Sequence, residues 1–193
     1  MSRRHLAQLV TEVSAPAPVG AIVLLLVAWH CTSSIAEAVA WGSLTVALTI
    51  VPPLLFLLRG VRRGRFSDRH VRLRQQRPVP ILAGLASVLV GFALLSWSGA
   101  PRELLALIVA MAVGLIVALL VTLVWKISIH VASVAGAVVI LVLLFGLPLV
   151  ALSPVVALVG WARVELGDHT PGQVAAGAII GAMVAGTVFT LLR

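Results

Sequence analysis

Long uninterrupted apolar stretches constrain this 193-residue chain more than any other feature. Residues 15–58 and 131–162 are apolar over lengths greater than one membrane crossing, which takes roughly 20 residues. Hydrophobic side chains make up 61% of the chain and charged ones only 10%, whereas soluble domains carry about 25% charged residues. Too few polar side chains remain to coat a water-soluble globule. The sequence therefore predicts an all-α, polytopic membrane helix bundle.

Seven spans account for the apolar stretches. They are expected at about 16–32, 38–58, 80–97 and 104–124, as two spans within 131–162, and at 173–192. The second span is expected to bend at Pro52-Pro53, and a turn near 146–148 or at 153–154 divides the long stretch. No charge lies in the middle of a span, as the cost of a charge in hydrocarbon demands. The prediction is one integral membrane domain, residues 1–193, with six or seven transmembrane helices.

The cations are distributed unevenly between the two faces that these spans define. Alternating the spans places twelve of the fourteen Lys and Arg on one face, eight of them in the 59–77 loop, and leaves Arg102 and Arg193 on the other. Loops rich in Lys and Arg stay cytoplasmic. We therefore expect a multi-pass protein of the inner (plasma) membrane with its basic face in the cytoplasm. No nucleic-acid partner is expected, because the basic loop lacks interleaved aromatic residues beyond Phe66.

Three polar segments on the basic face each precede an apolar helix directly. They are residues 67–78, 126–130 and 163–171. The helix-start signals are good, since Pro78 opens one span and Thr170 followed by a proline is typical of an N-cap with a first-turn proline. Free N–H groups at helix N-termini attract anions, and nearby cations strengthen this. The pattern predicts that three helix N-termini converge on one phosphate-binding site.

The spacing of these segments resembles the type 2 phosphatidic acid phosphatase superfamily. Its signature is Lys-x6-Arg-Pro, then Pro-Ser-Gly-His, then Ser-Arg-x5-His-x3-Asp. Here the first motif ends in Arg77 and a proline, the second appears as Ile-Ser-Ile-His at 127–130, and the third runs from Arg163 through His169 to Gln173. The resemblance covers a phosphatase-like core of residues 67–192 and leaves the spans within 1–58 outside it.

The resemblance implies a membrane lipid phosphatase that works through a phosphohistidine and needs no metal or other cofactor. In that family mechanism His169 attacks phosphorus and His130 donates a proton to the leaving group. The residues implied for phosphate binding are Arg77, Arg163, Ser128, Lys126, His70 and Arg74. The expected substrate is a lipid phosphate of the cytoplasmic leaflet: a polyprenyl or isoprenoid monophosphate or diphosphate, or a phosphatidic acid-type lipid. No motif distinguishes these lipids, and the oligomeric state stays open.

Several positions depart from the family pattern. His70 stands where the family has Lys, and Ile127 and Ile129 replace Pro and Gly. Gln173 replaces the Asp that would orient the nucleophilic histidine. A Gln oxygen accepts an Nδ1–H bond but cannot stabilise imidazolium by charge. We therefore expect either a slower enzyme or an orienting carboxylate supplied by Asp168 or Glu165.

The same residues also allow interpretations other than an enzyme. The chain could be a non-enzymatic anionic-lipid-binding relative or a small transporter, although a transporter would place its polar and broken-helix features near the bilayer midplane. His169 could cap its helix, Lys126 could snorkel to the headgroups, and the arginines at 59, 62, 63 and 65 suit a topology signal. Gly177-x3-Gly181 predicts a close-packing seam on the last helix.

Overall fold

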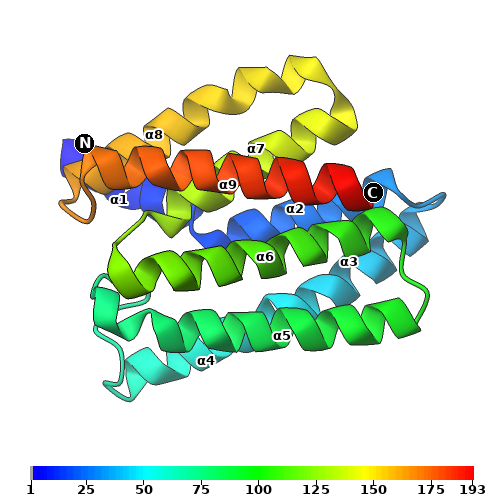
Figure 1. Cartoon of the computed structure of the whole chain (residues 1–193), viewed down its shortest axis with the longest axis horizontal. Helices are drawn as coiled ribbons and strands as arrows, with labels where there is room; N and C mark the ends of the chain where they lie inside the picture. Colours follow the sequence, from blue (N-terminus) through cyan, green and yellow to red (C-terminus); the bar gives the residue numbers. More distant parts are fainter. Residues whose placement is uncertain (1) are drawn as a thin grey trace.

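The structure, a computed structural model, describes residues 2–193 as an all-helical fold (Figure 1). The α-helices are α1 (Arg3–Val13), α2 (Pro16–His30), α3 (Ile35–Thr49), α4 (Val51–Arg62), α5 (Pro78–Trp97), α6 (Arg102–Val124), α7 (Ile129–Phe145), α8 (Ser153–Glu165) and α9 (Pro171–Leu192). Short 3₁₀ helices cover Arg74–Gln76 and Leu147–Leu152.

The helices are long and apolar enough to make this a multi-pass membrane protein. Within residues 2–193, five segments meet the length and hydropathy needed to cross a bilayer: Ile35–Arg62, Arg74–Trp97, Arg102–Val124, Leu147–Glu165 and Pro171–Leu192. A sixth is added if α1 and α2, which are bent by 46° to each other, count as one span. The fifth predicted span, the first of the two within 131–162, corresponds to α7, which is apolar but only 17 residues long. The predicted helical membrane bundle is therefore confirmed.

The helices are interrupted at the positions where prolines and glycines predicted a bend or a turn. The second predicted span is interrupted at Ile50, between α3 and α4, directly before the Pro52-Pro53 pair. α7 ends at Phe145, and Gly146 follows with a φ of 97°, a conformation that glycine adopts without steric cost. A 3₁₀ turn then leads into α8. Both predicted turn points are used, the first to end α7 and the second to begin α8.

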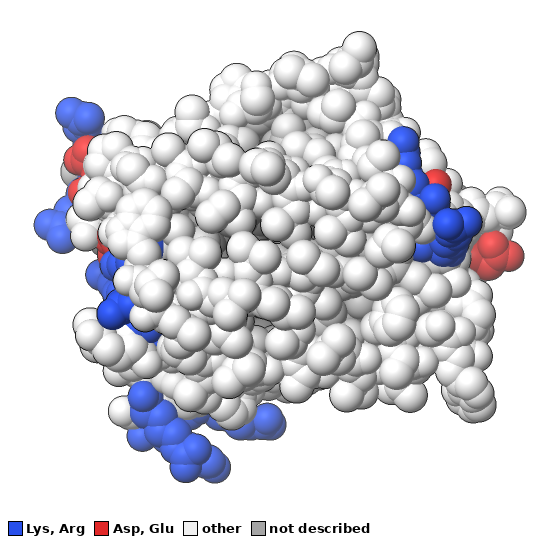
Figure 2. All heavy atoms as spheres, viewed as in Figure 1, with Lys and Arg blue, Asp and Glu red and all other residues white. Residues whose placement is uncertain are grey.

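The charged residues lie at the two ends of the bundle. Figure 2 shows Lys, Arg, Asp and Glu at opposite ends, with an uncharged band between them. Figure 1 shows α1, the 59–77 segment, the start of α7 and the α8–α9 connection at one end, which we call the basic end. The α2–α3 and α5–α6 turns and the C-terminus lie at the other. An uncharged band between two charged ends is what a bilayer requires.

A tight seam between α7 and α9 positions the basic end. A Cβ at Gly177 would lie 2.6 Å from the carbonyl oxygen of Ser128, and one at Gly181 would clash with the carbonyl of Ala132. The backbones of the two helices therefore touch, as the Gly-x3-Gly pattern predicted. This contact brings the first turn of α7 beside the first turn of α9.

The N-terminal helices share the core of the later ones. Leu24 of α2 is buried in one cluster with Leu95 of α5, Leu104 of α6, Ile140 of α7 and Phe189 of α9. The spans outside the family resemblance are thus packed against those inside it.

Candidate functional site

Three helix N-termini meet at the basic end. Arg77, Ser128 and Thr170 are the N-cap residues of α5, α7 and α9. The Ser128 N–H donates to the carbonyl of Gln173 over 3.2 Å, and Arg77 Nη1 donates to the carbonyl of Ile127 over 2.9 Å. The three helix starts therefore converge as predicted, and phosphate binding between them stays a prediction. We call the residues gathered here the polar cluster: Arg77, Lys126, Ser128, His130, Arg163, Asp168, His169 and Gln173.

The turn between α8 and α9 holds His169 at the centre of this cluster. Two consecutive N–H groups, those of Asp168 and His169, donate to the carbonyl of Arg163 over 3.1 and 3.2 Å. Gly167 enables the tight turn with a φ of 72°. Thr170 then starts α9 with a reciprocal capping box. His169 is left 6% exposed, fixed on both sides by backbone hydrogen bonds.

The partners of His169 define its tautomer. Nδ1 lies 3.2 Å from Oε1 of Gln173, and Nε2 lies 3.4 Å from Nη2 of Arg77. The N–H of Thr170 donates to the same Gln173 oxygen over 3.3 Å, so that oxygen is the acceptor. Nδ1 therefore carries the proton, and the Nε2 lone pair faces the guanidinium.

The surroundings keep the His169 ring neutral. Its pKa is lowered to about 3, first by burial and then by the cationic Arg77, Arg163 and Lys126. A neutral imidazole retains the lone pair that a nucleophile requires.

Arg77 connects all three segments. Nε donates to the carbonyl of Val71, Nη1 to that of Ile127, and Nη2 faces His169. Val71 has a φ of 46°, a left-handed conformation that β-branched residues rarely adopt. Asp68 shapes this strained loop by accepting the N–H of His70 over 2.8 Å. The 67–73 loop thus has a strained backbone at Val71, the residue whose carbonyl accepts a hydrogen bond from Arg77.

A second buried arginine lies beside the first. Arg163 is fully buried, and its Nη2 lies 3.0 Å from Oδ2 of Asp168, although this approach lacks hydrogen-bond direction. Arg72 holds the other carboxylate oxygen at 3.2 Å. Lys126 donates to the backbone carbonyl of Asp168 over 2.5 Å. Burial, followed by the charge of Arg77, lowers the pKa of Lys126. The three cations of the cluster, together with Arg72 from outside it, surround the single carboxylate of Asp168.

Several buried polar atoms of the cluster have no hydrogen-bond partner within residues 2–193. They are Ser128 Oγ, His130 Nε2, all three guanidinium nitrogens of Arg163 and Oδ2 of Asp168. Ser128 is an N-cap whose hydroxyl does not cap its helix, unlike Thr170. Unsatisfied buried donors cost about 1–3 kcal/mol each. An anion with several acceptor oxygens would satisfy them together, which is the chemistry of phosphate.

His130 and His70 form the edge of the cluster. Their ring centroids are 5.2 Å apart. Nε2 of His70 lies 3.0 Å from Oε1 of Glu12, and Arg69 donates to the same oxygen over 2.7 Å. Sequence reasoning missed Glu12, which α1 carries into the site. One signal pointed to it, because it is the sole acid among the first 36 residues.

The contacts of Arg74 differ from those expected from the sequence. Arg74 was expected to bind phosphate, but it donates to the carbonyls of Thr122 and Leu123 over 3.1 and 2.8 Å. It therefore caps the C-terminus of α6, where cations are favoured.

The orienting contact to His169 comes from Gln173. Asp168 pairs with arginines, and Glu165 lies 3.6 Å from Arg3. No carboxylate substitutes for the Asp of the family pattern among these contacts.

The cluster does not resemble a metal centre. Within residues 2–193 no three His, Cys, Asp or Glu side chains are grouped to hold an ion.

Comparisons with known protein families, curated proteins and solved structures find no match to this chain. The family resemblance therefore stays a prediction that rests on the residues and their geometry.

Proposed function

We propose that this protein is an integral membrane lipid phosphatase that hydrolyses the phosphomonoester or diphosphate of a lipid through a phosphohistidine. The observation that carries the proposal is the 3.4 Å approach of Arg77 Nη2 to His169 Nε2, with Nδ1 of the same ring held by Gln173. A neutral nucleophile lies beside a buried guanidinium, and both lie among buried donors that lack partners. A nucleophilic nitrogen among these donors supports attack on a phosphate whose oxygens the donors would hold.

In the first step the Nε2 lone pair of His169 attacks the terminal phosphorus, and the bond from that phosphorus to the leaving oxygen breaks. Arg77, Arg163, Ser128 and Lys126 stabilise the charge on the non-bridging oxygens. A bound phosphate dianion favours protonation of His130, which gives its proton to the leaving group, an alkoxide from a monoester or a lipid phosphate from a diphosphate. In the second step His130 takes a proton from water, which attacks the phosphohistidine and releases phosphate.

The membrane arrangement supports a substrate in the cytoplasmic leaflet of the inner (plasma) membrane. The basic end carries the cluster together with twelve of the fourteen Lys and Arg. Cation-rich ends stay in the cytoplasm. Anionic lipids of that leaflet would be attracted to the same end.

One observation favours a second function, an anionic-lipid-binding relative without turnover. Gln173 is uncharged, so nothing beside Nδ1 stabilises a developing imidazolium. Such a protein would bind lipid phosphates at the same cluster and release no phosphate.

Phosphate release from a panel of lipid phosphates separates the two functions. The purified protein should release phosphate from at least one substrate among farnesyl phosphate, farnesyl diphosphate and dioleoyl phosphatidate, and His169→Ala should abolish it. His30→Ala is the matched control, because His30 pairs with Glu103 over 3.1 Å, outside the cluster. Equal inertness of wild type and His169→Ala on the whole panel would overturn the enzyme and leave the binding relative.

A further inference from the structure

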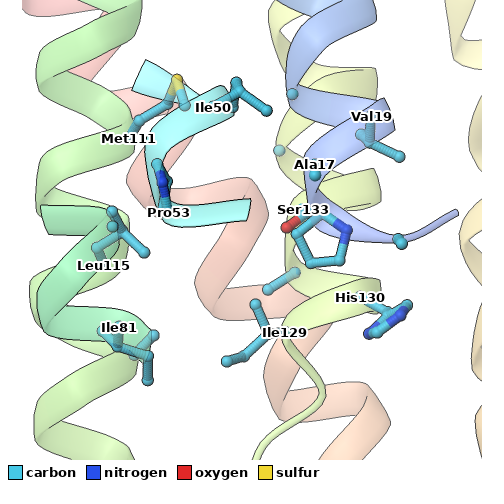
Figure 3. Close-up of a pocket in the computed structure, with 18 of the residues that line it drawn as sticks. Ala17, Val19, Ile50, Pro53, Ile81, Met111, Leu115, Ile129, His130 and Ser133 are labelled. Atoms are coloured by element: carbon cyan, nitrogen blue, oxygen red, sulfur yellow. The ribbon is translucent and has the colours of Figure 1, made fainter. Parts of the chain in front are cut away.

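A cavity of about 620 Å³ leads from the polar cluster into the bundle. Its polar end is lined by Glu12, Arg69, His70, Arg77 and His130. Figure 3 shows the rest of its wall: Ala17 and Val19 of α2 lie on one side, with Met111 and Leu115 of α6 on the other. The phosphate site proposed above and this cavity therefore share walls.

The cavity is deep and mainly apolar. Along α7 its lining extends from His130 to Ile140, ten residues that rise about 15 Å at 1.5 Å each. Thr49, a polar residue in the wall, donates its hydroxyl to the carbonyl of Thr45 over 2.8 Å, so it offers no free donor to a ligand. Ser133, the other hydroxyl in this wall, lies one helical turn from His130 near the polar end. Most of the wall beyond it suits hydrocarbon.

The break between α3 and α4 contributes to this space. Figure 3 shows Ile50 and Pro53 facing the cavity, across from α2. Gly114 of α6 lines it as well, and a Cβ there would meet no heavy atom within 4 Å.

We infer that the cavity binds the tail of a lipid phosphate that has one hydrocarbon chain of about farnesyl length. The inference rests on the proposed function, because the polar cluster would hold the phosphate of the same molecule. An extended covalent chain advances about 1.2 Å per bond, so about 15 Å accommodates about twelve bonds. A volume of about 620 Å³ lies in the middle of the range of about 300–1,000 Å³ in which pockets hold one small ligand. A glycerolipid with two long chains has far more hydrocarbon than this cavity holds.

A bulky substitution on α6 tests whether the cavity binds the lipid tail, which we call the tail site. Gly114→Phe places a ring in the cavity part-way down, without a clash for its first atom. Ile116→Phe is the matched control, since Ile116 lies on the same helix and is 42% exposed on the outside. Purified wild type and both variants are assayed with geranyl phosphate, farnesyl phosphate and dioleoyl phosphatidate. Thermal stabilisation by each lipid is measured in parallel, because it reports binding without turnover.

Wild type should prefer farnesyl phosphate to the phosphatidate by about tenfold or more in kcat/KM. Gly114→Phe should lose about tenfold toward farnesyl phosphate and keep its activity on the shorter geranyl phosphate, because it removes burial of the distal chain alone. Ile116→Phe should match wild type. Unchanged farnesyl activity in Gly114→Phe, or an equal preference for the two-chain lipid, would overturn the tail site.

The two proposals fail in different ways. If no lipid is hydrolysed but farnesyl phosphate stabilises wild type and not Gly114→Phe, the tail site stands and the phosphatase falls. If farnesyl phosphate stabilises wild type and Gly114→Phe equally, or stabilises neither, the tail site is wrong whatever the enzyme does.

Discussion

The guanidinium of Arg77 lies 3.4 Å from Nε2 of His169, although 92 residues separate them along the chain. The same guanidinium donates to two backbone carbonyls, those of Val71 and Ile127. One side chain thus ties together the loop before α5, the start of α7 and the start of α9. A planar group with several donors in fixed directions makes such a junction, and a lysine ammonium does not.

Arg77→Lys should lower kcat/KM for lipid phosphate by about 100-fold, the usual cost of losing one donor to a developing negative charge. The single charge is kept, but one Nζ cannot reach Val71, Ile127 and the substrate together. Arg65→Lys, on the exposed loop, is the control and should change little. Steady-state kinetics in detergent measure both. Equal activity of Arg77→Lys and Arg65→Lys would contradict the role of the guanidinium.

Gln173→Glu should raise the rate by about tenfold. Glu keeps the length of Gln and the capping box of α9, so the helix start survives. A carboxylate 3.2 Å from Nδ1 would stabilise the imidazolium and raise the pKa of His169 from about 3. The pH profile of kcat/KM should then shift its acid limb upward. A Gln173→Glu variant with wild-type rate and wild-type profile would show that Gln173 does not orient the nucleophile.

The pKa of His169 also predicts how stability depends on pH. In the unfolded chain the imidazole binds a proton below about 6.5, whereas in the folded protein it stays neutral down to about 3. The unfolded state therefore takes up more protons as the pH falls through this window, and folding stability decreases. Between pH 7.5 and 5 the loss is about 2 kcal/mol. The thermal midpoint of wild type should fall more over this range than that of His169→Gln, and parallel falls would contradict the prediction.

Gly181→Ala should destabilise the protein strongly, because its Cβ would meet the backbone of Ala132 and force α7 away from α9. Overpacking of this kind typically costs about 1–3 kcal/mol. Gly172→Ala is the matched control on the same helix, since its Cβ would meet nothing within 4 Å. Thermal unfolding of the two variants in the same detergent measures the difference. Equal midpoints would mean that the α7–α9 seam is looser than described.

Much of the fold could be predicted from the chain because hydropathy is a local property. The spans, the break before Pro52-Pro53 and the turn at Gly146 each depend on residues close together in sequence. The start of α9 is equally local, since Thr170 and Gln173 form its capping box within one turn. The grouping of three polar segments at one end followed from counting membrane crossings alone.

The site could be predicted less completely, because its contacts are long-range. Arg74 and Arg77 are three residues apart and chemically alike, yet one caps α6 and the other faces His169. Glu12 reaches His70 only because α1 packs beside the loop before α5. No local pattern distinguishes these outcomes, since each depends on the direction in which a side chain leaves its helix end.

Residue order alone thus established a helical membrane protein with most of its cations and three polar helix starts at one end. Those properties need only the cost of burying charge in hydrocarbon and the geometry of a helix turn. Packing decided that Arg77 faces His169 while Arg74 caps α6, and that an apolar cavity opens behind His130. Both outcomes depend on contacts between segments far apart in the sequence, which no single segment encodes.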